Sequence, residues 1–161
     1  MTAFNSTRRG QRGVGMLEVL IAVLVTSIGF LGMAALQAKA LSTNNSAMAR
    51  SMATVASYSI LDAMRADLAD AEANAYDGPV VANNCAASGG SGLAHTQLVD
   101  WCQQLGDRLG ALATTTGTVS CTKVSTATTN TADCTVTIQF DDSRAGSGGS
   151  STQKVVTRAK L

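Results

Sequence analysis

Hydrophobic residues follow two distinct patterns along the 161-residue chain. From Val19 to Leu36 the sequence reads VLIAVLVTSIGFLGMAAL, eighteen residues without a charge. As an α-helix this run would extend about 27 Å, close to the thickness of a membrane's hydrocarbon core. The pattern therefore predicts a membrane-spanning helix near the N-terminus.

From residue 37 the pattern becomes that of a half-buried helix, and residues 37–76 contain neither Pro nor Gly. Larger apolar side chains recur at three- and four-residue steps, which is typical of an amphipathic helix. They are Met48, Met52, Val55, Tyr58, Leu61, Met64 and Leu68. We expect this stripe to be the core-facing side of a continuation of the first helix over residues 37–76, rather than an adaptable methionine-rich groove. The sequence Asp77-Gly78-Pro79 ends the helical pattern.

Residues 77–161 are expected to form one globular head. Segment 80–116 is predicted to be an irregular connector with a short helix from about Thr96 to Ala113. Residues 117–125 and 133–140 alternate between apolar and polar, which predicts a β-hairpin, and a third strand is expected over 152–160. The predicted fold class is α+β, with a long N-terminal helix packed on a small antiparallel sheet.

All four cysteines lie in the second half of the chain, without a CxxC pair and with a single histidine. This spacing is poor for zinc and favours disulfides formed in an oxidising compartment, although free, buried cysteines are the alternative. Three pairings are possible. Cys121 and Cys134 lie roughly symmetrically on the two arms of the predicted hairpin, which favours their pairing and leaves Cys85 with Cys102. A one-residue shift in register would undo this geometry.

The charge distribution orients the chain in a membrane. Arg8, Arg9 and Arg12 precede the apolar run, and Lys39 is the nearest charge after it. The positive-inside rule then places the N-terminus in the cytoplasm and the head in the periplasm. The other basic residues are scattered singly, so nucleic acid is not an expected partner.

Glu18 is the one charge at the start of the apolar segment, where a carboxylate facing lipid costs a few kcal/mol. It stands in Arg12-Gly13-Val14-Gly15-Met16-Leu17-Glu18. Cleavage after Gly13 would leave a new ammonium group on Val14 and make Glu18 the fifth residue. This sequence, followed by a long apolar helix, resembles the prepilin signal of type IV pilins and secretion pseudopilins.

The resemblance implies a leader peptide at residues 1–13, removed by a membrane prepilin peptidase that also N-methylates Val14. It further implies that residues 14–36 form the transmembrane and later filament-core helix, and that Glu18 meets the N-terminal amine of a neighbouring subunit. The alternative is that Glu18 lies near the cytoplasmic interface and reaches the headgroups. The expected architecture is also that of a pilin.

The amino-acid sequence of the N-terminal segment is most similar to that of PilV-type minor pilins, the type IV pilus modification proteins. Such a protein would be a single-pass inner-membrane precursor that enters a surface pilus and affects adhesion and twitching motility. Its partners would be the peptidase, other minor and major pilins, the inner-membrane assembly platform and, before assembly, membrane lipid. The alternatives are a minor pseudopilin of type II secretion, a pilus-displayed adhesive module, or a membrane-anchored protein that is never cleaved.

No enzyme, cofactor or metal is expected. His95 is in no recognisable nucleophile motif and is interpreted as a surface or hydrogen-bonded histidine. Asp141-Asp142 is interpreted as a solvated turn rather than a calcium site, because the surrounding loop is poor in oxygen ligands. Trp101 is expected to pack against a disulfide or helix rather than to form a surface patch.

Overall fold

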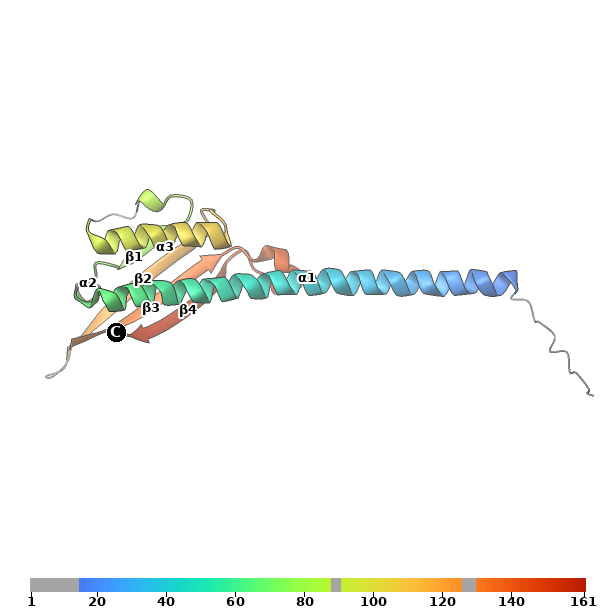
Figure 1. The fold of residues 1–161 in the computed structure, drawn as a ribbon, viewed down its shortest axis with the longest axis horizontal. Coiled ribbons are helices and arrows are strands. Elements are labelled where there is room, and N and C mark those ends of the chain that lie inside the picture. Colours follow the sequence, from blue (N-terminus) through green and yellow to red (C-terminus); the bar gives the residue numbers. More distant parts are fainter. Residues whose placement is uncertain (1–14, 88–90, 126–129) are drawn as a thin grey trace, which may run out of the picture. The chain divides into compact units, whose positions relative to one another are not determined.

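The computed structural model describes residues 15–87, 91–125 and 130–161, which belong to two compact units that meet between Ala40 and Leu41. The long helix α1 (Met16–Ala66) contributes to both units. The second unit also contains α2 (Leu68–Glu72), β1 (Gly78–Val81), η1 (Cys85–Ala87), α3 (Leu93–Leu109), β2 (Thr116–Ser125), β3 (Asn130–Phe140), η2 (Ser143–Gly148) and β4 (Gln153–Lys160) (Figure 1). This order of elements is the α+β class predicted from the sequence.

The first unit is the N-terminal part of α1. Its two central hydroxyl groups are satisfied within the helix: Thr26 donates to the Ala22 carbonyl and Ser27 to the Val23 carbonyl, each over 2.7 Å. These polar side chains therefore need no water partner. Within the described residues, α1 is the helix that is long and apolar enough to cross a membrane.

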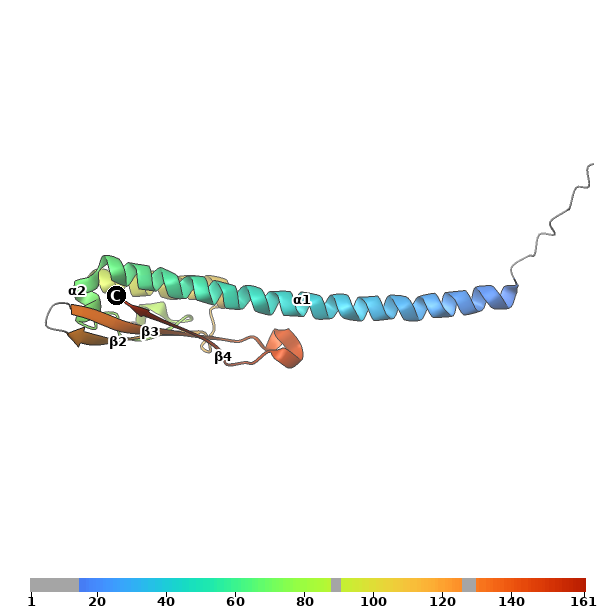
Figure 2. The same ribbon diagram turned by 90° about the horizontal axis from the view of Figure 1, so that it is seen from below.

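The second unit contains a four-stranded sheet of order β1-β2-β3-β4 in which every neighbouring pair is antiparallel. The C-terminal part of α1 and helix α3 lie over the same face of this sheet (Figures 1 and 2). Alternate strand side chains point to that face, and Val119, Val136 and Ile138 are almost fully buried there. The core of the head thus lies between the two helices and one face of the sheet.

Trp101 of α3 contacts both α1 and the sheet. It is 2% exposed, and its indole Nε1 donates to the Ala56 carbonyl of α1 over 2.9 Å. Its ring lies against Gly117 of β2, where a Cβ atom would overlap the ring and would also lie 2.8 Å from Cδ1 of Leu105. Trp101 therefore packs against a helix, as predicted, and requires glycine at position 117.

The face of α1 that packs into the head differs from the predicted apolar stripe. Met48, Val55 and Tyr58 are 58%, 52% and 53% exposed. The buried face is Ser46, Ala53, Ala56, Ser57, Ile60, Leu61 and Met64. Small side chains let α1 approach the sheet and α3 closely. The prediction was correct for Leu61 and Met64, and Met52 is partly buried. It was wrong for Met48, Val55 and Tyr58, and also for Leu68, which lies in α2 and is 37% exposed. The prediction followed the spacing of large apolar side chains, so it could not detect a buried face made mostly of Ala and Ser.

The continuous helix predicted to about Tyr76 instead ends at Ala66. Asp67 leaves helical geometry at φ −129° and precedes the short α2, and Asn74 adopts a left-handed φ of 62° that turns the chain back. The Asp67 carboxylate then accepts a hydrogen bond from the Tyr76 hydroxyl over 3.1 Å. This local contact stabilises the reversed chain.

Two further boundaries differ from the prediction. Gly78–Val81 forms strand β1, where the sequence predicted a helix stop at Asp77-Gly78-Pro79 and an irregular connector from residue 80. Pro79 is tolerated because β1 is at the edge of the sheet. Helix α3 spans Leu93–Leu109 instead of about 96–113, because Gly110 ends it with a left-handed φ of 101°.

Candidate assembly segment

The structure describes the candidate segment from Gly15 onward, so Gly13 and Val14 lie outside the described residues. The Gly15 carbonyl accepts the first helical hydrogen bonds, from the Glu18 amide over 2.9 Å and from the Val19 amide over 3.3 Å. Glu18 is therefore in the first turn of α1. A carboxylate at this end of a helix interacts favourably with the helix dipole.

Glu18 is exposed, and within the described part of the chain its carboxylate forms no salt bridge. The next charged residue along α1 is Lys39. In lipid or in a protein core, a lone carboxylate in such a segment needs a cation partner from outside this helix segment.

The apolar surface that follows Glu18 is almost wholly uncovered. Every large apolar side chain from Met16 to Leu41 is between 50% and 88% exposed. Adding a Cβ atom at Gly29 or Gly32 would meet no other atom within 4 Å. A stretch of this size in water would be an aggregation hazard, so it requires a lipid or protein environment.

The N-terminal sequence matches a family model, the prokaryotic N-terminal methylation motif, over residues 8–34. The N-terminal segment of the chain is therefore similar to that of type IV prepilins. The match includes Gly13, Val14 and Glu18 together with most of the apolar run. Neither a curated protein nor a solved structure matches the chain.

This prepilin segment supports membership of the type IV pilin and pseudopilin class, which is structural rather than catalytic. It implies processing by a prepilin peptidase and assembly with other subunits of that class. Together with the apolar helix it also indicates membrane anchoring.

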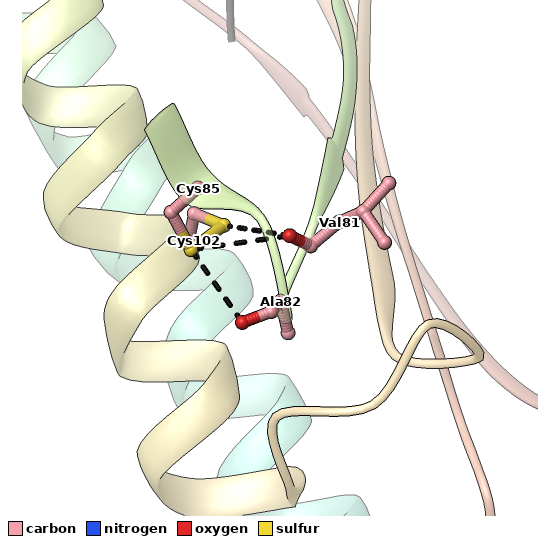
Figure 3. Close-up of a disulfide and its surroundings, with 4 residues drawn as sticks. All are labelled: Val81, Ala82, Cys85 and Cys102. Atoms are coloured by element: carbon pink, nitrogen blue, oxygen red, sulfur yellow. Dashed lines mark hydrogen bonds between the residues drawn. A yellow bond between two sulfur atoms is a disulfide. The ribbon is translucent and has the colours of Figure 1, made fainter. Parts of the chain in front are cut away.

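Both disulfides of the head join the cysteines favoured from the sequence. Cys85 of η1 is bonded to Cys102 of α3, with their Cα atoms 5.5 Å apart. Figure 3 shows this bridge beside the end of β1, where the Cys102 sulfur lies 3.4 Å from the Val81 carbonyl oxygen. Disulfide sulfurs carry no proton, so this is a close contact rather than a hydrogen bond. The bridge ties the connector after β1 to α3.

The second disulfide crosses the central hairpin. Cys121 and Cys134 are direct register partners of β2 and β3, with Cα atoms 4.1 Å apart. They are 7% and 1% exposed, and the Cys121 sulfur lies 4.0 Å from the Met64 sulfur of α1. Closing loops of 17 and 13 residues, each bridge would contribute about 3 kcal/mol by the chain-entropy argument.

The sequence predicted Asp77 only as part of a helix stop. In the structure, its side chain accepts a hydrogen bond from β2 just beyond the residues that pair with β1. Its Oδ1 accepts a hydrogen bond from the Cys121 amide over 2.9 Å. Partial desolvation raises the pKa of Asp77, and the hydrogen bond from Cys121 opposes that rise. Because the side chain stays largely exposed, water screens both effects.

Tyr76 links the start of the head to α3. It is fully buried, and its hydroxyl contacts both the Asp67 carboxylate and the Gln97 side-chain oxygen. A phenol has one proton, so a rotated Gln97 amide would donate to the Tyr76 oxygen while Tyr76 donates to Asp67. Burial, together with the hydrogen bond and negative charge of Asp67, raises the pKa of Tyr76 and keeps it neutral.

The two acids of Asp141-Asp142 have different roles. Asp141 is exposed and accepts a hydrogen bond from the Ser143 amide over 2.8 Å, which lowers the pKa of Asp141. Asp142 is 5% exposed, accepts a 2.6 Å hydrogen bond from Ser46 of α1, and lies 3.5 Å from Arg50. The prediction of a solvated turn is thus right for Asp141 and wrong for Asp142. Asp142 instead binds the segment that leads into η2 to α1 through Ser46 and Arg50.

The described residues contain no group of three or more His, Cys, Asp or Glu side chains that could hold a metal ion. His95 is half-buried, and its Nδ1 has no hydrogen-bond partner among the described residues. The expectation of a surface or hydrogen-bonded histidine is therefore wrong for that nitrogen.

Proposed function

We propose that the chain is a minor pilin of a type IV pilus, of the PilV type, cleaved after Gly13 and N-methylated at Val14. The observation that carries this proposal is the methylation motif at residues 8–34, which includes most of the exposed apolar run of α1. A disulfide-bonded head suits a subunit that works outside the cytoplasm.

Before assembly, residues 14–36 span the inner membrane, with the N-terminus in the cytoplasm and the head, residues 77–161, in the periplasm. During assembly this helix moves from lipid into the filament core. Its backbone hydrogen bonds stay within the helix, so the transfer breaks none of them. Glu18 pairs with the methylated Val14 amine of a neighbour, which supplies the missing cation.

A second feature supports assembly through α1. Beyond the membrane segment, four large side chains remain uncovered: Leu41, Met48, Val55 and Tyr58 are 63%, 58%, 52% and 53% exposed. The first three recur every seven residues, and Tyr58 follows Val55 by three. Heptad spacing of apolar side chains is typical of a helix that packs along another helix. We call these four residues the α1 stripe and assign it to contact with neighbouring subunits.

In this role the chain is a substrate of the prepilin peptidase and a partner of other minor and major pilins at the inner-membrane assembly platform. It helps to initiate or modify pilus assembly, and through the pilus it affects adhesion and twitching motility.

Intact mass spectrometry of sheared surface pili tests the proposal. The expected result is a chain that begins with methylated Val14 and contains two disulfides. A Gly13→Arg chain should accumulate in the membrane as a precursor 13 residues longer. Recovery of the processed chain only from membranes would instead favour a type II secretion pseudopilin. An uncleaved wild-type chain would reject processing altogether.

A further inference from the structure

The face of the sheet that points away from α1 and α3 is polar and positively charged. Its side chains alternate along each strand with those that enter the core. The outer sheet face consists of Thr116, Thr118, Ser120 and Thr122 of β2, Asp133, Thr135, Thr137 and Gln139 of β3, and Lys154, Val156, Arg158 and Lys160 of β4.

Positive charge on the outer sheet face is concentrated on β4. Lys154, Arg158 and Lys160 are all exposed, and within the described residues none of them forms a salt bridge. Strands β2 to β4 contain one acid on this face, Asp133, which is the register partner of Lys160. Away from this face, Arg50 and Arg65 of α1 and Lys123 of β2 each form a salt bridge with an acid. The outer sheet face of β2 to β4 thus has a net positive charge, because three cations face one acid.

Hydroxyl groups lie next to these cations in an ordered array. Thr118 is opposite Thr137, and Ser120 is opposite Thr135, which is in turn opposite Arg158. Directly opposite side chains in an antiparallel sheet are roughly 5 Å apart, and same-face neighbours along a strand are roughly 7 Å apart. A shallow hollow of about 430 Å³ lies on this face, lined by Thr122, Thr135, Arg158 and Lys160 and also by the carboxylate-bearing Asp133.

The composition of this face narrows the class of ligand. Val156, 54% exposed, is its one large apolar side chain in strands β2 to β4, so the face lacks the apolar anchors typical of protein interfaces. The same strands expose no aromatic ring on which a nucleobase could stack. Rows of hydroxyls beside guanidinium and ammonium groups suit sugar hydroxyls and acidic sugar substituents.

We propose that the outer sheet face binds an anionic polysaccharide. Arg158 and Lys160 contact its carboxylate or sulfate groups, and the hydroxyls of Thr118 and Thr135 form hydrogen bonds with the sugar ring. This face is opposite α1, so the ligand does not compete with helix packing through the α1 stripe. The inference is independent of the filament role.

The test uses the full chain in detergent micelles at about 0.15 M salt, where long-range charge attraction is screened. Binding is measured to heparin, which is sulfated, to polygalacturonate, which carries carboxylates, and to neutral dextran. We expect binding to one or both acidic polymers and none to dextran. The Arg158→Gln/Lys160→Gln chain should bind about tenfold more weakly, because two charge-assisted contacts are lost.

A matched double variant, Arg65→Gln/Arg108→Gln, removes the same charge from α1 and α3 and should bind like the wild type. Thr118→Val/Thr135→Val keeps side-chain shape and charge and should also weaken binding about tenfold. Circular dichroism checks that each variant keeps its fold. An equal loss in the control variant, no effect of the threonine changes, no binding to either acidic polymer, or tighter binding to double-stranded DNA would each overturn the proposal.

Discussion

The Cys121 amide donates a 2.9 Å hydrogen bond to the carboxylate of Asp77, just beyond the point where β1 stops pairing with β2. The side chain of one residue thus takes the place of a strand backbone. The same Cys121 forms the disulfide with Cys134 beneath α1, so Asp77 supports the strand at the position of the bridge.

Asp77→Asn should keep this hydrogen bond, because the amide retains an acceptor oxygen, whereas Asp77→Ala should lose it. We expect Asp77→Ala to lower the free energy of unfolding by about 1 kcal/mol and Asp77→Asn to change it little.

Folding also raises the pKa of Asp77, so the protonated acid stabilises the folded state at low pH. This contribution to the free energy of unfolding is lost as pH rises through the folded-state pKa. In the Asp77→Asn chain, which has no acid at this position, the free energy of unfolding should not show this small decrease with pH. Denaturant unfolding followed by circular dichroism at pH 4 and pH 7 measures both effects. Equal destabilisation by both variants would mean that the negative charge itself is needed.

The raised pKa of Tyr76 predicts alkaline sensitivity of the head. Its folded-state pKa lies above the unfolded value of 10.0, so the neutral phenol stabilises the fold below pH 10, and this contribution is lost at higher pH. The chain has two tyrosines, and Tyr58→Phe leaves Tyr76 as the one phenol to observe. In that variant, ultraviolet absorbance should show ionisation well above pH 10 that coincides with unfolding. Ionisation of Tyr76 in a head that remains folded would contradict the burial argument.

Gly117→Ala should destabilise the head by about 1 to 3 kcal/mol, because its Cβ would overlap the Trp101 ring and press on Leu105. The matched control is Gly29→Ala, where an added Cβ meets nothing within 4 Å. Trp101 is the single tryptophan, so its fluorescence reports directly on this contact. An unchanged emission spectrum and unfolding midpoint in Gly117→Ala would show that the ring can move aside without cost.

The sequence was most informative where a physical requirement leaves few alternatives. An uncharged run of eighteen residues must be shielded from water, and strict alternation in β2 and β3 sets which face is buried, so the helix, the hairpin and the Cys121–Cys134 bridge were predictable. Contacts between distant segments were not. Ser46 meets Asp142 across 96 positions, and nothing near Asp142 distinguishes it from its exposed neighbour Asp141. The small-residue face of α1 was missed for the same reason, since its role depends on how closely α3 and the sheet approach.

The α1 stripe should matter for assembly and not for folding. Met48→Glu/Val55→Glu changes exposed residues, so the free energy of unfolding should shift by no more than about 0.5 kcal/mol per site. Incorporation into sheared pili should nevertheless fall strongly, because two carboxylates would be buried against a neighbouring helix. Ala47→Glu provides a charge control on the same helix, about 100° around its axis from Met48. Quantitative immunoblots of pili and membranes compare the variants. Normal incorporation of the double variant would remove the stripe from the assembly interface.

Glu18 provides the sharpest test of the proposed pairing with Val14. Glu18→Gln keeps side-chain size and hydrogen bonding but removes the charge, so it should leave cleavage after Gly13 largely intact while impairing entry into the filament. Asp62→Asn, which removes an exposed charge from the head part of α1, is the control and should assemble normally. The readout is the mass of the chain in membrane and pilus fractions. Because cleavage and incorporation are measured on the same chain, a processed Glu18→Gln chain in normal amounts in pili would refute the pairing while leaving the prepilin processing intact.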